Sequence, residues 1–219
     1  MSAAASEVLV PELAFDVEDV RAAEHGAVPT LCFQVRIDAG GAEIRALALN
    51  AQLRVDAARR SYEAGERERL FELFGAPPDW ARTVRSLRWT NATLNVPSFT
   101  GTTTVELPVP CTYDFDVAAA KYLHALDGGE VPLELLFSGT LFFGGPDGRL
   151  QVVHLPWDRE ARCALPVAVW REALERAFPG TAWLRIDRDL FDRLQAYKSS
   201  RALLTWDATL EQLLEGPRD

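Results

Sequence analysis

Five residues between positions 111 and 124 have side chains that could perform chemistry together. They are Cys111, Asp114, Asp116, Lys121 and His124. Asp114 and Asp116 are separated by one residue, so in an extended segment both carboxylates point the same way. Two neighbouring carboxylates can shift each other's pKa and act as general acid and base, or they can hold a cation. These five residues are therefore a candidate polar cluster.

A structural role explains the same residues more simply, and we favour it. Asp116 is placed to cap a helix expected over residues 117–126, and Asp114 suits the turn before it. Cys111 suits a small core position. Lys121 and His124 are three residues apart on the polar face of that helix, which is typical of a solvated surface. We therefore predict no catalytic residue and keep the cluster only as a candidate.

Metal and cofactor motifs are missing from the sequence. The three histidines fall in an expected loop, helix and strand end, and none has the spacing of a metal-ligand pair. The three cysteines are an odd number, widely spaced and without a CxxC pair, which indicates free thiols in a reducing compartment. The sequence has no P-loop, no GxGxxG and no GxSxG elbow. We expect no metal site and no cofactor.

The six tryptophans are the strongest indication of a binding surface. Trp80, Trp157 and Trp206 stand beside proline or charged residues, so we expect them to be partly exposed. Clustered exposed aromatic residues mark partner-binding patches, and these three are the candidate partner surface. The alternative is that they fill gaps between sheet and helices, as we expect for the other three, which are Trp89, Trp170 and Trp183.

The charge of the chain excludes some classes of partner. Thirty-two acidic residues against 23 basic ones give a net charge of −9. Nucleic-acid binding and docking on an anionic membrane both need a basic face, so both are disfavoured. The first residues lack the basic and apolar regions of a signal peptide, and no apolar run reaches the roughly 20 residues of a membrane span. We expect a cytoplasmic protein, with a homo-oligomer possible.

Alternation of apolar and polar residues predicts a largely antiparallel β structure. The stretch 130–144 has the apolar density of a strand buried on most of both sides, with Gly139 marking a bulge or a close backbone approach. Residues 31–37 and 47–55 alternate with period two on either side of the glycines at 40 and 41. That pattern predicts a hairpin. Further strands are expected over 11–17, 85–97, 103–109, 150–153 and 162–165. Between them we expect a charged, irregular segment at 18–29, a turn at 98–101 and a hairpin turn at 144–148, after which 150–153 returns antiparallel.

Helical patterns interrupt and follow these strands. Two intervening helices are expected over 63–74 and 117–126, the first with Leu70, Phe71 and Phe74 on its apolar face. From Pro166 the pattern becomes helical, with helices after that proline and over 189–199 and 207–215. The predicted fold is therefore α+β: an antiparallel sandwich or open barrel of seven or eight strands in residues 1–165, with a C-terminal helical segment, 166–219, packed on the sheet as one folding unit.

Several short motifs resemble an actinobacterial protein family of unknown function, with members encoded near nickel–iron hydrogenase genes. The motifs are Phe99-Thr-Gly-Thr, Leu107-Pro-Val-Pro-Cys-Thr-Tyr-Asp114, Lys121-Tyr122, Val131-Pro-Leu133, Leu136-Phe-Ser-Gly-Thr140 and Pro166-Val-Ala-Val-Trp170. The resemblance spans nearly the whole chain and brings no catalytic residues with it. It implies an accessory role beside a hydrogenase subunit or maturation factor.

Two functions remain open at this point. The first is a non-catalytic protein-binding or assembly accessory protein, which the missing catalytic motifs, the tryptophans and the resemblance favour. The alternative is a small-ligand-binding protein or enzyme with a pocket in the interior of the sheet, with the polar cluster near its mouth.

Overall fold

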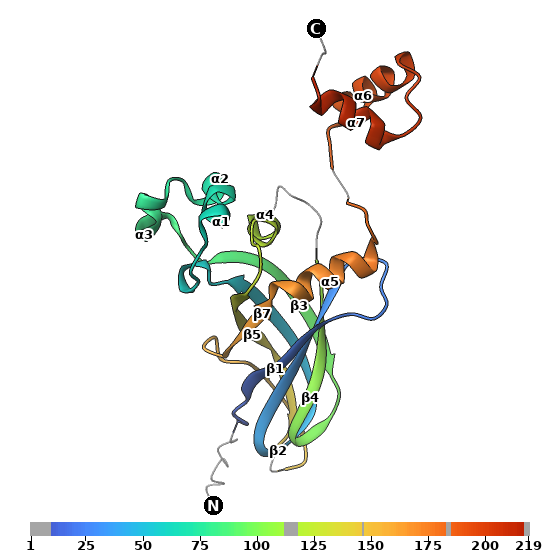
Figure 1. Ribbon diagram of the computed structural model, residues 1–219. Coiled ribbons are helices and arrows are strands. Elements are labelled where there is room, and N and C mark those ends of the chain that lie inside the picture. The colour runs from blue at the N-terminus through green and yellow to red at the C-terminus, as the bar shows by residue number, and fades with distance from the viewer. Residues whose placement is uncertain (1–9, 112–117, 146, 183–184, 217–219) are drawn as a thin grey trace, which may run out of the picture. The chain divides into compact units, whose positions relative to one another are not determined.

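A computed structural model of the protein describes residues 10–111, 118–145, 147–182 and 185–216 (Figure 1). The chain divides into two compact units, residues 1–182 and 183–219, which we call the sheet unit and the helical unit. The division falls later than the expected boundary at 165, because the first C-terminal helix groups with the sheet.

The sheet unit contains one antiparallel sheet of seven described strands that does not close. The strands are β1 (Ala14–Ala22), β2 (Thr30–Val55), β3 (Leu87–Val96), β4 (Phe99–Pro110), β5 (Glu130–Gly144), β6 (Leu150–His154) and β7 (Glu160–Pro166). This arrangement confirms the predicted α+β class and the predominance of an antiparallel sheet.

Strand β2 is continuous over 26 residues, so the predicted hairpin is wrong. Its first part lies between β1 and β4, since Val35 pairs with a residue of each, and its second part lies between β3 and β5. Gly40 and Gly41 have positive φ angles of 58° and 87°, as a turn would need. They form a bulge instead: β2 has more residues than β4 between the pairs Asp38–Thr102 and Glu43–Thr100.

Two other stretches that were expected to interrupt the strands are also extended in the structure. The turn expected at 98–101 is not a reversal, because β3 and β4 both run antiparallel to β2, one after the other. The segment after residue 17, expected to be irregular, continues as β1 to Ala22 with a bulge between Val17 and Asp19. In each place, pairing with β2 keeps an irregular stretch extended.

Strand β5 has the predicted character. Its odd-numbered side chains from Val131 to Phe143 are buried, with glycine at 139, while the even-numbered ones are partly exposed. Gly139 marks the close backbone approach that the sequence indicated: a Cβ atom built there would lie 2.1 Å from the carbonyl oxygen of Ala48. Strands β6 and β7 pair with opposite ends of β5, and the antiparallel pairing of β6 confirms the return expected after Gly144, although residue 146 of the expected turn lies outside the described residues.

Seven α-helices lie in the described part of the chain. They are α1 (Ala64–Arg69), α2 (Phe71–Phe74), α3 (Trp80–Thr83), α4 (Ala118–His124), α5 (Val167–Ala177), α6 (Arg188–Ser200) and α7 (Trp206–Leu214), with 3-10 turns at Ala57–Arg59 and Pro77–Asp79. The helix expected over 63–74 is broken at Leu70, and Phe71, expected in the core, is 60% exposed.

Helices cover one end of the sheet (Figure 1). Helix α5 contacts β1, β2 and β7 and buries Val167, Trp170, Ala173 and Leu174. Helix α4 contacts β3 and α2, and it carries the fully buried Tyr122. The core is apolar throughout the strands of the sheet unit, with Leu31, Phe33 and Leu53 among its fully buried residues. Burial of such side chains contributes about 1.5–3 kcal/mol each.

The helical unit consists of α6 and α7 and confirms the two C-terminal helices that the sequence predicted. Asp187 caps α6 by accepting a hydrogen bond from the Asp189 amide at 2.9 Å, and Thr205 caps α7 through the Ala208 amide at 3.1 Å. The rings of Phe191 and Trp206 lie 5.4 Å apart. No helix in the described residues combines the length and the apolar character needed to cross a membrane.

Candidate functional site

The residues of the candidate polar cluster have different surroundings. Asp114 and Asp116 lie outside the described residues. Cys111 is buried at the end of β4, where its thiol donates to the carbonyl of Val109 at 3.8 Å. Burial raises the pKa of the Cys111 thiol to about 12, against a smaller lowering by a backbone hydrogen bond. The thiol is therefore protonated at neutral pH and is a poor nucleophile.

Lys121 and His124 share helix α4 but engage different neighbours. The Lys121 ammonium pairs with the carboxylate of Glu72 on α2. The His124 ring meets Trp170 of α5 edge to face, with centroids 4.6 Å apart. Burial, together with the charge of Arg171, lowers the pKa of His124. Lys121 thus joins two helices at the surface, while His124 packs beneath α5.

The three tryptophans of the candidate partner surface also separate. Trp80 packs edge to face against Tyr62 and Phe74, and its indole N–H donates to the carbonyl of Gly75 at 2.9 Å. Trp157, between β6 and β7, is 92% exposed. Trp206 begins α7 and is 38% exposed. Trp80 and Trp157 therefore occupy different parts of the sheet unit, and Trp206 belongs to the helical unit.

A buried ion pair that the sequence reasoning missed connects α1 to the loop after α4. The Glu66 carboxylate is almost fully buried and accepts hydrogen bonds from Arg60 at 3.0 Å and from the amides of Glu63 and Asp127. Burial raises the pKa of Glu66, but these hydrogen bonds and the charge of Arg60 outweigh it, so the pKa is lowered. The spacing of Glu63 and Glu66, a capping box at the start of α1, was the available signal.

Two tyrosines extend this buried network. The hydroxyls of Tyr62 and Tyr122 are 2.8 Å apart, and Tyr62 also donates to the carbonyl of Ala57 at 2.6 Å. Burial raises the pKa of Tyr62 and that of Tyr122, so both hydroxyls stay protonated. The network joins α1, α4 and the 3-10 turn after β2, which gives it a structural role.

A pocket of about 540 Å³ opens beside this network, and we call it the arginine pocket. Its lining contains three arginines and no acidic residue: Ala57, Ala58, Arg60, Ser61, Tyr62, Arg67, Pro77, Trp80, Ala81, Val84 and Arg85. Arg60 is neutralised by Glu66. The volume lies within the roughly 300–1,000 Å³ typical of small-molecule sites.

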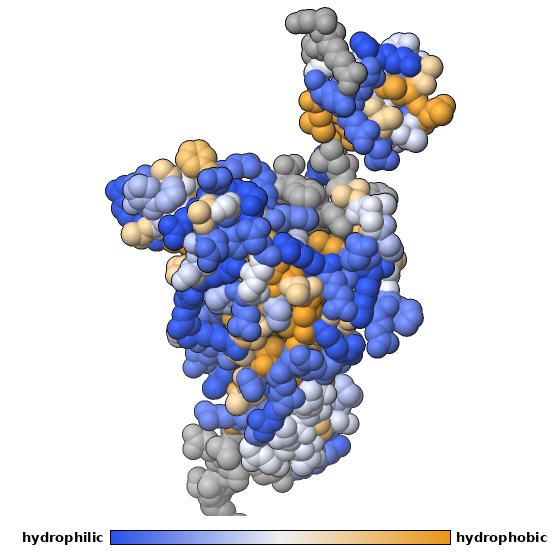
Figure 2. Space-filling model, viewed as in Figure 1, coloured by the Kyte–Doolittle hydropathy of each residue, from blue (hydrophilic) through white to orange (hydrophobic). Residues whose placement is uncertain are grey.

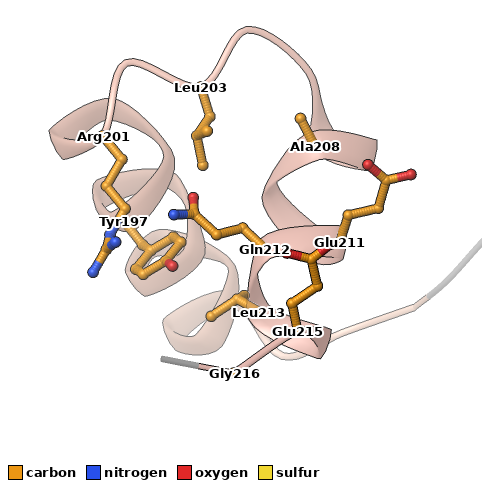
Figure 3. Close-up of a pocket in the computed structure, with 9 residues that line it drawn as sticks. All are labelled: Tyr197, Arg201, Leu203, Ala208, Glu211, Gln212, Leu213, Glu215 and Gly216. Atoms are coloured by element: carbon orange, nitrogen blue, oxygen red, sulfur yellow. The ribbon is translucent and has the colours of Figure 1, made fainter. Parts of the chain in front are cut away.

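A second cavity, of about 750 Å³, lies in the helical unit (Figure 3). Gln212 reaches from α7 toward Tyr197 of α6, while the Arg201 guanidinium lies over the Tyr197 ring at 4.6 Å. The buried Oε1 atom of Gln212 has no hydrogen-bond partner among the described residues. Leu203 and Leu213 add apolar walls. The cavity therefore combines apolar surface with an acceptor that could receive a hydrogen bond.

The described residues offer no sign of a metal centre. No group of three or more His, Cys, Asp or Glu side chains within the described part of the chain is arranged to hold a metal ion. The apolar side chains of the strands fill the interior of the sheet, and the two cavities described above lie outside it.

Comparison with solved structures returns matches with low similarity. A late embryogenesis abundant (LEA) protein shares 13% identity over 72% of each chain, with a TM-score of 0.34. Beta-glucosidase from Kluyveromyces marxianus, in complex with glucose, shares 13% over 70% of this chain (TM-score 0.24), and beta-glucosidase 3B from Thermotoga neapolitana shares 12% over 69% (TM-score 0.25). The chain spans only 15% and 16% of the two enzymes.

Comparison by sequence identifies the family. No curated protein matches the chain. A family model described as "Family of unknown function (DUF6084)" matches residues 10–219. Because the match extends from the start of the described residues to the last residue, the chain belongs to this family of unknown function, DUF6084.

Proposed function

We propose that the protein is a non-catalytic accessory protein that binds another protein through its helical unit. The observation that carries this proposal is the exposure of apolar side chains on α6 and α7. Leu190, Phe191, Trp206, Leu210 and Leu213 are each about two-fifths exposed, and Leu204 and Leu214 are about nine-tenths exposed. Figure 2 shows hydrophobic residues on the visible surface of this unit. Several large apolar side chains exposed on one small unit are typical of a protein-binding site.

The charges on helix α7 indicate what kind of partner would fit that helix, while Lys198 and Arg201 supply basic groups beside Trp206 and Tyr197. Helix α7 contains acidic residues, Asp207 and Glu211, and no basic one. A partner with an apolar surface bordered by basic side chains would complement it. The cavity at Tyr197 could receive one partner side chain, and a donor on that side chain could satisfy Gln212.

The resemblance of the motifs suggests which partner to test first. The motif resemblance implies relatives encoded near nickel–iron hydrogenase genes, and on that ground we propose a subunit or maturation factor of such a hydrogenase as the partner. In this proposal the antiparallel sheet, as a sandwich or open barrel, is the scaffold of a cytoplasmic protein and the helical unit binds the partner.

A substitution in the cavity tests the proposal. Leu213 lines the cavity and is 42% exposed, so Leu213→Asp places a charge in the proposed interface. The matched control is Leu150→Asp, which changes an exposed leucine of β6. We expect Leu213→Asp to weaken binding to purified hydrogenase subunits by at least about tenfold, as the loss of a central apolar contact does.

Binding should be measured with the purified full-length chain by interferometry, with co-purification from the native host as the second readout. Support requires that wild type and Leu150→Asp bind the same partner and that Leu213→Asp loses it. Equal binding by all three chains would exclude the helical unit as the interface. Failure to bind any hydrogenase subunit, with a different partner lost on Leu213→Asp, would reject the hydrogenase link alone.

A further inference from the structure

We propose that the arginine pocket binds a small organic anion, with its carboxylate or phosphate group held by Arg67 and Arg85 and its ring or apolar part lying against Trp80. This site lies in the sheet unit and is independent of the protein interface proposed above. It is also distinct from the pocket expected in the interior of the sheet, since the segment after β2, helices α1 and α3 and the residues that flank α3 form it.

Charge is the first argument. The chain has a net charge of −9, yet the lining of this pocket contains arginines and no acid. Two arginines of the same helical cluster that lie outside the lining have acidic partners: Arg69 pairs with Asp127 and Arg82 with Asp79. Arg67 and Arg85 form no ion pair with a carboxylate in the described residues, and Arg60 is already neutralised. The pocket therefore contains two arginine charges without an acidic partner, and these charges would attract an anion and repel a cation.

The two guanidiniums are positioned but have donors to spare. The Nε atom of Arg67 donates to the carbonyl of Tyr62 at 3.0 Å, and Nη1 of Arg85 donates to the carbonyl of Val84 at 3.3 Å. Each bond uses one donor of the five that a guanidinium presents. The remaining N–H groups match the paired oxygens of a carboxylate or phosphate, which arginine binds in a bidentate manner.

Trp80 supplies a fixed apolar wall. Its indole is held by the hydrogen bond to Gly75 and by ring contacts with Tyr62 and Phe74 at 5.3 and 5.8 Å. A ring that is already immobilised loses little entropy when a ligand stacks on it. Because the other walls near Trp80 include Pro77 and Ala81, the ligand should carry a flat or apolar body beside its anionic group.

The neighbouring cavity limits where the anionic group can lie. Arg67, Tyr62 and Pro77 also line a second cavity, whose walls include the carboxylates of Glu63 and Glu68. Those carboxylates would repel an anion on that side of Arg67. The anionic group should therefore bind on the side that faces Arg85, which makes Arg85 the residue whose loss weakens binding most.

Calorimetric titration of the full-length protein tests this site with three probes at constant ionic strength: phenyl phosphate, inorganic phosphate and the neutral benzamide. We expect phenyl phosphate to bind best, inorganic phosphate more weakly and benzamide not at all. Arg85→Gln should weaken phenyl phosphate binding by at least about tenfold, the factor expected when a charge-assisted hydrogen bond is lost. Arg67→Gln should weaken it less.

The matched control is Arg88→Gln, which changes another exposed arginine with no ion pair in the described residues and outside the lining. Circular dichroism confirms that each variant is folded. If Arg85→Gln and Arg88→Gln weakened phenyl phosphate binding equally, the effect would come from the net charge of the protein and not from a contact in the pocket. That result would overturn the proposal. Equal affinity for phenyl phosphate and inorganic phosphate, or no binding of either, would overturn it as well.

Discussion

Helix α5 and the pair α6–α7 follow one another in the chain and differ sharply in burial. All three carry apolar residues at helical spacing. Helix α5 buries four residues, with contacts to β1, β2 and β7. Among the described residues of the helical unit, only Thr209 is buried. An amphipathic pattern thus predicts a helix and its apolar face, whereas the surface that covers this face depends on contacts distant in the sequence.

The strongest test of the sheet side of this comparison is Gly139→Ala. The new Cβ would lie 2.1 Å from the backbone oxygen of Ala48, and neither strand can yield without breaking the β2–β5 ladder. We expect a loss of about 4–5 kcal/mol in the free energy of unfolding, or no folded protein at all. Urea unfolding followed by circular dichroism measures it.

The control for this substitution is Gly128→Ala, since a Cβ at Gly128 meets no atom within 4 Å and its φ is not positive. It should cost less than about 1 kcal/mol. Similar losses for the two variants would show that the close approach at Gly139 does not limit the fold.

Two tryptophans allow the helices themselves to be compared. Trp170 on α5 is 3% exposed and Trp206 on α7 is 38% exposed. Trp170→Ala should cost about 3–5 kcal/mol in the unfolding of the sheet unit, because it leaves a cavity beneath the helix. Trp206→Ala should leave that transition unchanged within about 0.5 kcal/mol.

Hydrogen exchange of the strand amides shows whether Trp206→Ala destabilises the sheet or leaves it unchanged, because it reports on the sheet directly. If Trp206→Ala increased exchange in β2 and β5 as much as Trp170→Ala did, α7 would be part of the cooperative core. That result would favour the prediction that the whole segment 166–219 packs on the sheet as one folding unit. It would argue against a helical unit whose stability is independent of the sheet.

Local patterns predicted much of the fold. The alternation around β5, the mid-strand Gly139 and the turn after Gly144 indicated a strand with one buried face, a close approach and an antiparallel return. The glycines at 40 and 41 did not specify their role, because positive φ serves a hairpin turn and a bulge equally well. Pairing of β2 with β3, β4 and β5 decides between them, and those partners are far away in the sequence.

The candidate site was harder to predict for a related reason. Lys121 and His124 are close in the sequence and engage different helices, α2 and α5. The lining of the arginine pocket draws on residues spread over positions 57–85, so it forms only when the chain folds Arg67, Trp80 and Arg85 around the same space. The capping-box spacing of Glu63 and Glu66 indicated a local hydrogen bond, but the burial of Glu66 also depends on Asp127, 61 positions away, and local spacing does not indicate that contact.

Of the three destabilising substitutions, Glu66→Gln should have the smallest effect. The amide keeps the shape of Glu66 but leaves Arg60 without its buried counter-charge, and such a loss typically costs about 3 kcal/mol or more. Because Arg60 also donates to the carbonyl of Gly128, we expect about 3 kcal/mol at neutral pH. Glu68→Gln, an exposed change on the same helix, should cost less than about 0.5 kcal/mol.

The pH dependence separates the charge of Glu66 from its shape. The pKa of Glu66 is lowered in the folded state from its ordinary value of 4.5, so the ionised carboxylate stabilises the fold fully above that value. As the pH falls below 4.5 and through the folded pKa, this stabilisation is lost, and the protonated residue then resembles glutamine. The stability gap between wild type and Glu66→Gln should therefore be constant near neutrality and narrow in acid. A gap of the same size at every pH, measured by urea unfolding, would assign the effect to packing.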